Sequence, residues 1–249
     1  MLGEAQRPLS ARRATARIVA GGPPYHDQIT GLNDHGVAAV IFDLDGVLVD
    51  STAVVERAWR RWAVAHDVSA TDVLAVAHGR PAREVVRAFA PHLDAEAEAA
   101  LLDESEAADS TGLLAVPGAA ACVSVVRGGP WAIATSGGRP LALGRLAAAK
   151  LPVPDVLVTA DDVRAGKPEP EPYLRAAEAL AISPGDCLVI EDAPAGVLAA
   201  KRAGMAVIAV CTTHVAAQLA DADVVCSGMP EVRRHVAAAL DGDHRPRLR

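Results

Sequence analysis

The amino-acid sequence predicts an α/β fold, in which a parallel sheet has helices on both faces and a small helical unit is inserted into it. Three observations predict this fold. Short apolar runs recur along the chain, helical segments alternate with them, and the alternation is interrupted once, after the first run. Alternating strands and helices imply parallel strands joined by right-handed crossovers. The 249 residues, 51% of them hydrophobic, can bury the core of one large domain or of two unequal ones.

The predicted strands are short, uninterrupted apolar runs that are rich in β-branched residues. Such runs are typical of strands covered on both faces, whereas a half-exposed strand alternates apolar and polar residues. The runs are VAAVIF at 37–42, WAIAT at 131–135, DVLVT at 155–159, CLVIE at 187–191 and AVIAV at 206–210.

Helices are predicted between these strands, at 140–150, 172–182 and 194–204. The last of them begins with Pro194, which suits the first turn because no partner for its missing N–H is needed there. It ends at Gly204, the residue type that most often terminates a helix. These segments supply the crossovers that a parallel sheet requires.

Residues 52–115 interrupt this alternation, because the segment is composed of helical stretches only. A helical unit inserted directly after the first strand lies over the carboxyl ends of the strands, where open α/β sheets bind their ligands. We therefore predict a small helical cap, joined to the core by two short linkers near Ser51 and at 116–118.

The chain divides into four parts on this reading. The N-terminal part shows no sustained periodicity and contains GGPP at 21–24, so we interpret it as flexible. The parts are a flexible extension at 1–36, a catalytic core at 37–51 and 116–240, a helical cap at 52–115 and a C-terminal tail at 241–249.

Composition excludes several classes of function. The net charge of −7 and the pI near 5.6 leave no basic field to attract nucleic acid or anionic lipid. Aromatic residues make up only 3% of the chain, which argues against platforms on which bases stack. The expected partner is thus a small molecule, and a monomer is the default assembly.

Location follows from hydropathy and cysteine usage. No apolar run approaches the roughly 18 residues of a membrane span, and the arginine-containing N-terminus lacks the apolar stretch of a secretory signal. The four cysteines are far apart and form no CxxC pair, which indicates reduced thiols. These features predict a cytoplasmic protein.

Asp43 and Asp45 are the first candidate catalytic residues. They follow the apolar run 37–42 directly, and the run then stops at Gly46. Two carboxylates brought together repel each other unless a cation or a shared proton compensates. Mg²⁺ is the expected cation because it prefers carboxylate and carbonyl oxygen. The alternative is a structural pair that binds an arginine or caps a helix.

Four motifs in order resemble the haloacid dehalogenase-like superfamily, in its branch with a helical cap after the first motif. They are DLDGVLVDS at 43–51, ATSGGR at 134–139, GKPEPEPY at 166–173 and IEDAPAG at 190–196. The resemblance spans 37 to about 213 and implies a Rossmann-like core, a Mg²⁺ cofactor and chemistry on a small phosphate ester.

The resemblance assigns distinct roles to the first two acids. Asp43 matches the nucleophile that attacks phosphorus and becomes an aspartyl phosphate, a task suited to a carboxylate that is ionised at neutral pH. Asp45 matches the general acid and base, and its backbone carbonyl is expected on the metal. Their roles require different environments, with Asp43 held ionised by Mg²⁺ and Asp45 free to keep a proton.

Residues of the second and third motifs match the phosphate-binding groups of the family. The hydroxyl of Thr135 is expected to donate to a phosphoryl oxygen, and Ser136, Gly137 and Gly138 to present backbone N–H groups, an arrangement suited to anions. Lys167 matches the lysine that lies between nucleophile and phosphate, where a compact cation neutralises charge.

The fourth motif supplies the remaining metal ligands. Asp192 is expected to bind Mg²⁺ directly, with Glu191 either a second ligand or bound through water, because Mg²⁺ takes few carboxylates and keeps several waters. The pair can also cap the helix that begins at Pro194, whose N-terminus favours negative charge. Both roles are compatible.

Members of the family catalyse different reactions, and particular residues of this chain argue against some of these reactions. Metal-free dehalogenases lack the second acid of the first motif and the paired acids of the fourth, both present here. The phosphonate-cleaving members use a cap lysine, and 52–114 contains none. Sugar phosphomutases similar to β-phosphoglucomutase carry a histidine where this chain has Val55, and a cap lysine, although Arg80 and Arg83 can supply a second phosphate site.

Several segments resemble the glycerol-phosphate and sugar-phosphate phosphatases. We therefore predict a phosphatase that hydrolyses a small sugar or polyol phosphate, with His78, Arg80 and Arg83 as the cap residues expected to touch it. The alternatives are the phosphomutase and a non-catalytic binding protein on the same fold. The binding protein is marked by loss of Asp43, Asp45 or Lys167, and all three are present.

Overall fold

The structure is a computed structural model in which residues 36–77 and 80–241 are described. The predicted extension at 1–36, apart from Gly36, and the predicted tail at 241–249, apart from Asp241, lie outside the described residues, as does His78. None of the described helices is long and apolar enough to cross a membrane.

A parallel six-stranded sheet forms the centre of the molecule, in the order β5-β4-β1-β6-β7-β8. This confirms the predicted fold class, and the five predicted strands are all present within one or two residues of their expected bounds. The sixth strand, β8, was not predicted. The strands are β1 (Ala39–Phe42), β4 (Trp131–Ala134), β5 (Val156–Val158), β6 (Cys187–Glu191), β7 (Ala206–Val210) and β8 (Val224–Cys226).

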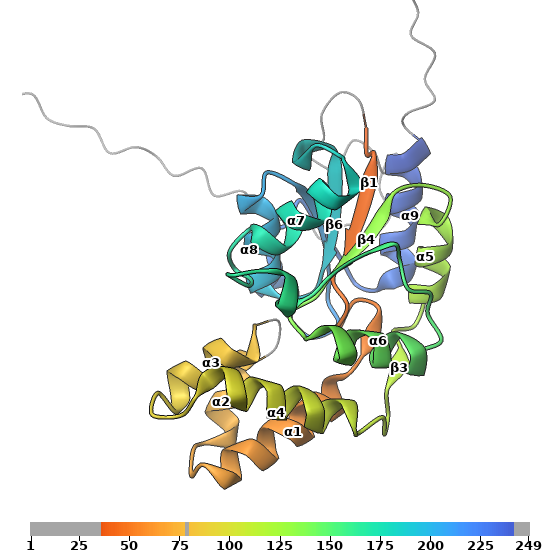
Figure 1. The fold of residues 1–249 in the computed structure, drawn as a ribbon. Helices are drawn as coiled ribbons and strands as arrows, with labels where there is room; N and C mark the ends of the chain where they lie inside the picture. Colours follow the sequence, from red (N-terminus) through yellow and green to blue (C-terminus); the bar gives the residue numbers. More distant parts are fainter. Residues whose placement is uncertain (1–35, 78–79, 242–249) are drawn as a thin grey trace, which may run out of the picture.

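Helices cover both faces of this sheet (Figure 1). On one face lie α7 (Glu171–Leu180) and α8 (Pro194–Arg202), and on the other lie α5 (Ala119–Val126) and α9 (Met229–Asp241). The helix α6 (Arg139–Ala148) lies at the end of the sheet nearest the inserted helices. The sequence did not predict α5 and α9.

The central strand β1 is covered on both faces, which explains why all of its residues are apolar. Val40 and Phe42 belong to the hydrophobic cluster under α5 and α9, whereas Ala39 and Ile41 belong to the cluster under α7 and α8. Successive side chains of a strand point to opposite faces, so a strand covered on both sides needs apolar residues at every position.

The inserted segment folds into four helices around a separate hydrophobic cluster. Trp59, Trp62, Val85, Val86 and Leu102 are among its buried members. We propose the division into a core of 37–51 and 116–240 and a cap of 52–115 on this basis. The four helices are α1 (Thr52–Ala65), α2 (Ala70–Ala77), α3 (Ala82–Phe89) and α4 (Ala95–Ala107).

Two chain segments lead into and out of the inserted helices, and they pair with each other. The strands β2 (Val49–Asp50) and β3 (Leu114–Ala115) form a short antiparallel ladder. Because both crossings are tied together, the inserted unit is held at the carboxyl edge of the sheet. Short 3₁₀ turns complete the described elements: η2 (Ala160–Asp162), η3 (Pro184–Asp186) and η4 (Ala216–Leu219).

Leu188 of β6 tests how much the sheet core contributes to stability. Its side chain is fully buried, so Leu188→Ala is expected to lower the free energy of unfolding by about 2–5 kcal/mol, the usual effect of a buried Leu-to-Ala truncation. The control is Leu101→Ala on α4, because Leu101 is 57% exposed. Urea unfolding measures both, and equal effects of the two substitutions would contradict the assignment of the core.

Candidate active site

The predicted catalytic residues come from three neighbouring strands. Asp43 directly follows β1, Thr135 directly follows β4, and Glu191 is the last residue of β6. In the sheet β1 lies between β4 and β6, so the parallel strands end side by side. Residues from the predicted first, second and fourth motifs therefore meet at one edge.

Lys167 joins two of these acids in the interior. Its Nζ donates to Oδ1 of Asp43 over 2.5 Å and to Oε1 of Glu191 over 2.7 Å, and the side chain is only 1% exposed. The hydroxyl of Tyr173 also donates to Glu191, over 2.7 Å. The lysine is thus fixed against the candidate nucleophile and has no contact with bulk solvent.

Glu191 has a structural task besides its contact with Lys167. Its Oε2 accepts hydrogen bonds from the backbone N–H groups of Asp192 and Ala193, just before α8 begins at Pro194. These contacts order the backbone before α8 but are not the predicted helix cap, because no side chain of the described residues accepts a hydrogen bond from the first turn of α8. A Cβ at Gly196 would lie 1.6 Å from Oε1 of Glu191, so only glycine leaves room for the carboxylate. Both oxygens already have protein donors, which favours Asp192 over Glu191 as a direct metal ligand.

Asp192 reaches the edge beside the turn that follows β1. Gly46 in that turn has a positive φ of 81°, and a Cβ there would lie 2.0 Å from Oδ2 of Asp192. The hydroxyl of Thr213 donates a short hydrogen bond to the same oxygen. The carboxylate is therefore placed between a turn that requires glycine and a threonine that the sequence did not single out.

Both carboxylate oxygens of Asp45, the acid expected to keep a proton, have hydrogen-bond partners in the structure. Its Oδ1 accepts from the hydroxyl of Ser51 over 2.6 Å, and its Oδ2 accepts from Nη1 of Arg145 over 2.6 Å. The other side of the Arg145 guanidinium pairs with Glu106 of α4. Lys167 and Arg145 thus offset part of the repulsion between Asp43 and Asp45, whereas from the sequence we expected Mg²⁺ as the cation, with a bound arginine as the alternative.

One feature of the sequence indicates that Arg145 is buried, although we did not use it. Leu141, Ala142 and Leu146 are buried on the same side of α6, and Arg145 follows Leu141 by four residues. A charged residue at that spacing faces the interior, where it needs partners. No motif includes Arg145 or Glu106, so pattern comparison alone missed both.

Burial and like charge alter the ionisation of this cluster. Burial raises the pKa of Asp43 to about 7, although Lys167 opposes the rise. Burial and the charges of Glu191 and Asp43 hold the pKa of Asp192 well above its usual range. For Glu191, burial also acts upward, but Lys167 and the hydrogen bonds outweigh it and lower the pKa. The cluster lacks the positive charge needed to keep all three acids ionised.

The second motif lies beside these acids, but its amides are engaged. Thr135 is buried, and its Oγ1 accepts from the N–H of Gly137 over 3.2 Å. The N–H of Gly138 donates to Oδ2 of Asp103, on α4, over 3.0 Å. Two of the three N–H groups expected to face a phosphate, those of Gly137 and Gly138, therefore donate to protein oxygens in this arrangement.

The two predicted cap arginines differ in their position relative to the site. Arg80 lines the cavity next to the acids and lies 3.6 Å from Glu84. Arg83 is not among the residues that line this cavity, and its Nε lies 4.0 Å from Glu96. The structure thus does not bring Arg83 to the site, because its position on α3 directs it toward α4. His78 lies outside the described residues.

A cavity of about 80 Å³ lies at the site and is lined by residues of both the core and the inserted helices. Five acidic side chains and two basic ones line it among the described residues, so its wall is negative. Val55, which occupies the position of the mutase histidine, is part of the lining. The lining residues are Asp43, Asp45, Gly46, Ser51, Thr52, Val55, Trp59, Ala77, Arg80, Ala82, Asp103, Glu106, Ser136, Gly137, Arg145, Asp192 and Thr213.

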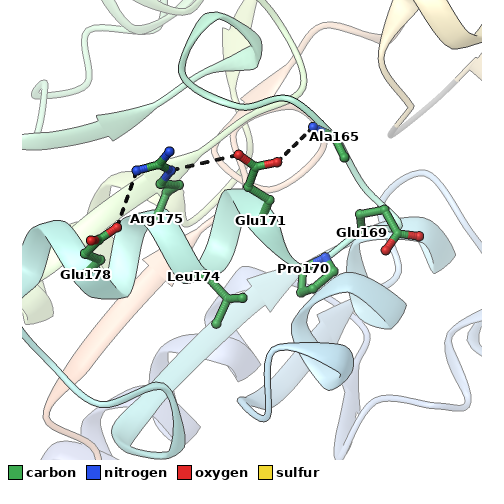
Figure 2. A pocket seen from close by; sticks show the side chains of 7 residues that line it. All are labelled: Ala165, Glu169, Pro170, Glu171, Leu174, Arg175 and Glu178. Carbon is green, nitrogen blue, oxygen red and sulfur yellow. Dashed lines mark hydrogen bonds and ion pairs between the residues drawn. The ribbon is translucent and has the colours of Figure 1, made fainter.

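A larger cavity, of about 350 Å³, lies at the start of α7 and contains none of the predicted site residues. Figure 2 shows that three of its charged side chains pair: Arg175 lies between Glu171 and Glu178. Glu171 also accepts from the N–H groups of Arg164 and Ala165, over 3.1 and 2.9 Å. Glu171 in the wall of this cavity therefore anchors the loop before α7, the loop that carries Lys167.

The site residues fit a divalent cation. Carboxylate oxygens of Asp43, Glu191 and Asp192 all lie within 4.8 Å of one another, and all three side chains are buried. Oxygen donors of this kind suit Mg²⁺, and the excess of negative charge calls for a cation. The acids alone do not identify the ion.

Comparison with known proteins agrees with this geometry. A model of the haloacid dehalogenase-like hydrolase family matches residues 37–204. The chain belongs to that family, which confirms the resemblance drawn from the motifs.

Named relatives extend over most of the chain. It is 44% identical over 197 residues to hexitol phosphatase A of Escherichia coli (strain K12), covering 77% of this chain and 91% of the relative. It is 41% identical to validoxylamine A 7'-phosphate phosphatase of Streptomyces hygroscopicus subsp. limoneus, covering 78% and 94%. The solved β-phosphoglucomutase of Clostridium difficile has the same fold, with a TM-score of 0.68 at 23% identity, covering 79% and 93%.

Gly46 tests the placement of Asp192. Gly46→Ala is expected to lower the free energy of unfolding by about 2–4 kcal/mol, because the new methyl group meets the Asp192 carboxylate and the backbone there has a positive φ. The control is Gly144→Ala in α6, where a Cβ meets open space and a helix gains roughly 1 kcal/mol. Urea unfolding measures the free energy of unfolding of both variants. An unchanged free energy of unfolding in Gly46→Ala would contradict the described turn.

Proposed function

We propose that the protein is a Mg²⁺-dependent phosphomonoesterase that hydrolyses a small sugar or polyol phosphate through an aspartyl phosphate. The observation that carries the proposal is the buried contact of Lys167 with Asp43, next to Asp45 and Asp192, at the edge where β1 and β6 end. A carboxylate held beside a cation at a cavity mouth is a suitable acceptor for a phosphoryl group. The phosphatase names of the two relatives support this class of reaction.

Charge is the main obstacle to binding a phosphate here. The cavity wall is negative, and a phosphate ester brings more negative charge to it. Asp43, Asp192 and the backbone carbonyl of Asp45 are the groups that would hold Mg²⁺, with Glu191 behind them. When bound, Mg²⁺ supplies the positive charge that offsets the phosphoryl oxygens. Lys167 supplies a further cation from the protein itself.

The first step transfers the phosphoryl group to the enzyme. A carboxylate oxygen of Asp43 forms a bond to phosphorus, and the bond from phosphorus to the ester oxygen breaks. Asp45 gives its proton to that oxygen, so an alcohol leaves instead of an alkoxide. Charge neutralisation and alignment account for most of the rate gain in phosphoryl transfer.

The contacts of Asp45 indicate which oxygen carries the proton. A guanidinium can only donate, so Oδ2, which faces Arg145, must accept. Oδ1 faces the hydroxyl of Ser51, which can donate or accept. The transferable proton therefore belongs on Oδ1. In the second step Asp45 takes a proton from water, the water oxygen attacks phosphorus, and Asp43 is released together with inorganic phosphate.

The substrate class follows from the relatives and the cavity wall. The most similar relative named above is a hexitol phosphatase, which favours a sugar-alcohol phosphate over the other candidates, glycerol phosphate and hexose or deoxyhexose phosphates. Asp103 and Glu106 contribute carboxylate oxygens to the wall, and Arg80 contributes donors. Hydroxyl-rich molecules pair well with such a mixture.

A phosphomutase is the second candidate, because a β-phosphoglucomutase has the same fold. A mutase needs a second phosphate site under the cap. Val55 lines the cavity where such mutases carry a histidine, and the cap segment has no lysine. Hydrolysis is therefore the better-supported outcome. A non-catalytic role is disfavoured because Asp43, Asp45 and Lys167 meet at the edge. We retain a monomer and a cytoplasmic location as parts of the proposal.

Asp43→Asn tests the nucleophile. Release of phosphate from a panel of sugar and polyol phosphates is expected to fall to background, because an amide cannot form the acyl phosphate. The control is Asp72→Asn on α2, an exposed acid of the cap that is expected to retain full activity. Circular dichroism verifies that both variants are folded. Turnover by folded Asp43→Asn would contradict the mechanism, and formation of an isomeric phosphate by the wild type would favour the mutase.

Metal removal tests the cofactor. Protein stripped with a chelator is expected to release phosphate at a rate on the order of 10² or more below the Mg²⁺-loaded protein, since a main source of positive charge is lost. Added Mg²⁺ is expected to restore the rate. Undiminished hydrolysis in the presence of excess chelator would contradict a Mg²⁺-dependent reaction.

A further inference from the structure

Arg145 is the only arginine among the residues in 36–77 and 80–241 whose side chain is fully enclosed, with an exposure of 4%. It comes from α6 of the core, and it lies between two carboxylates from different parts of the chain. Asp45 belongs to the loop after β1, and Glu106 belongs to α4 of the inserted helices. A buried guanidinium with two anionic partners is held firmly, since water does not compete for its donors.

The partners of the guanidinium are divided between core and cap. One terminal nitrogen donates to Asp45 over 2.6 Å, and the other donates a short hydrogen bond to Glu106, which is 8% exposed. The third nitrogen, Nε, has no hydrogen-bond partner among the described residues. The two carboxylates therefore define the position of Arg145 together.

The contact with Glu106 depends on where α4 lies. α4 packs on α6, and Asp103 of α4 accepts from the backbone N–H of Gly138. At another point of the interface a Cβ on Gly166 would lie 2.3 Å from Pro81, so core and cap are in close contact. Any movement that lifts α4 from the core removes Glu106 from Arg145 and leaves the guanidinium with Asp45 alone.

We propose that Arg145 and Glu106 are positioning residues that couple the seating of the cap to the orientation of Asp45. This inference rests on the proposed function, because it concerns the proton that Asp45 gives to the leaving group. With α4 seated, Glu106 fixes Arg145, and Arg145 fixes Oδ2 of Asp45. Oδ1 is then directed toward Ser51 and the cavity that holds the ester. With α4 lifted, Asp45 loses this orientation, and protonation of the leaving oxygen is less efficient.

A competing role for Glu106 is direct contact with the hydroxyl groups of the substrate, because it lines the cavity. Two probes without such hydroxyls separate the roles. Benzyl phosphate and 4-nitrophenyl phosphate have similar bodies, but only the benzyl ester needs a proton for its leaving oxygen. A residue that acts through Asp45 affects the benzyl ester more, whereas loss of contacts to a polyol affects neither probe.

The experiment measures kcat and KM on both esters for Glu106→Gln, Arg145→Lys and Asp45→Asn. Glu106→Gln keeps the shape of the side chain and removes its charge. Arg145→Lys keeps the charge and removes the two-sided donor geometry. Glu104→Gln, an exposed neighbour on α4, is the matched control. The fraction of folded protein is determined for each variant by urea unfolding.

We expect Asp45→Asn to reduce kcat for benzyl phosphate by about 10²-fold or more, with a much smaller effect on the nitrophenyl ester. Glu106→Gln and Arg145→Lys are expected to show the same selectivity, with a loss of about 10-fold to 100-fold on the benzyl ester, the scale of a misplaced catalytic group. Glu106→Gln added to Asp45→Asn is expected to cause no further loss on the benzyl ester, since both act through one proton transfer.

Equal losses on the two esters, or a full additional loss in the double variant, would overturn the inference and leave Arg145 as a structural ion pair. Unchanged kinetics on both probes, with a raised KM for a hexitol phosphate, would assign Glu106 to substrate binding instead. If Glu106→Gln does not fold, Arg145→Lys alone and combined with Asp45→Asn is measured on the two esters instead, and the same outcomes support or overturn the inference. Failure of the proposed function itself is distinct, because the wild type would then release phosphate from neither ester.

Discussion

The structure of the site depends on one buried cation, the ammonium group of Lys167, which lies between Asp43 and Glu191. Without it, two enclosed carboxylates would face each other at the ends of adjacent strands, and the cost of burying an unpaired charge is several kcal/mol. The lysine reaches this point because Glu171 anchors its loop from α7. Glu191 in turn orders the backbone of Asp192 and Ala193, just before α8 begins. One interaction thus connects the proposed nucleophile Asp43, the backbone before α8 and the candidate metal ligand Asp192.

A second buried cation repeats this arrangement on the other side of the cavity. Arg145 lies between Asp45 and Glu106, as Lys167 lies between Asp43 and Glu191. The two acids for which we propose different chemical roles therefore differ in partner. Asp43 faces a compact ammonium within the core, and Asp45 faces a guanidinium that also contacts the cap. In our proposal, the pairing with Arg145 allows the position of α4 to influence Asp45 and not Asp43.

Much of the fold and site could be predicted because short-range patterns specify them. The apolar run before Asp43 and the run before Glu191 identified β1 and β6, and parallel strands place their ends together. The contacts of Arg145, Glu106 and Thr213 could not be predicted, because they join residues far apart in the sequence whose types are ordinary on a helix or loop. The same holds for the N–H of Gly138, which was expected to face phosphate and donates to Asp103 of α4, 35 residues away in the sequence.

The central claim is that the carboxylate beside Lys167 accepts the phosphoryl group during turnover. The most direct test is to quench the reaction with acid within the first turnover, digest the protein and locate the added phosphoryl group by mass spectrometry. We expect it on the peptide that contains Asp43, at that residue alone, and we expect none when Asp43 is asparagine. Steady release of phosphate with no phosphoryl group on Asp43 at any quench time, or with the group on another side chain, would contradict the account.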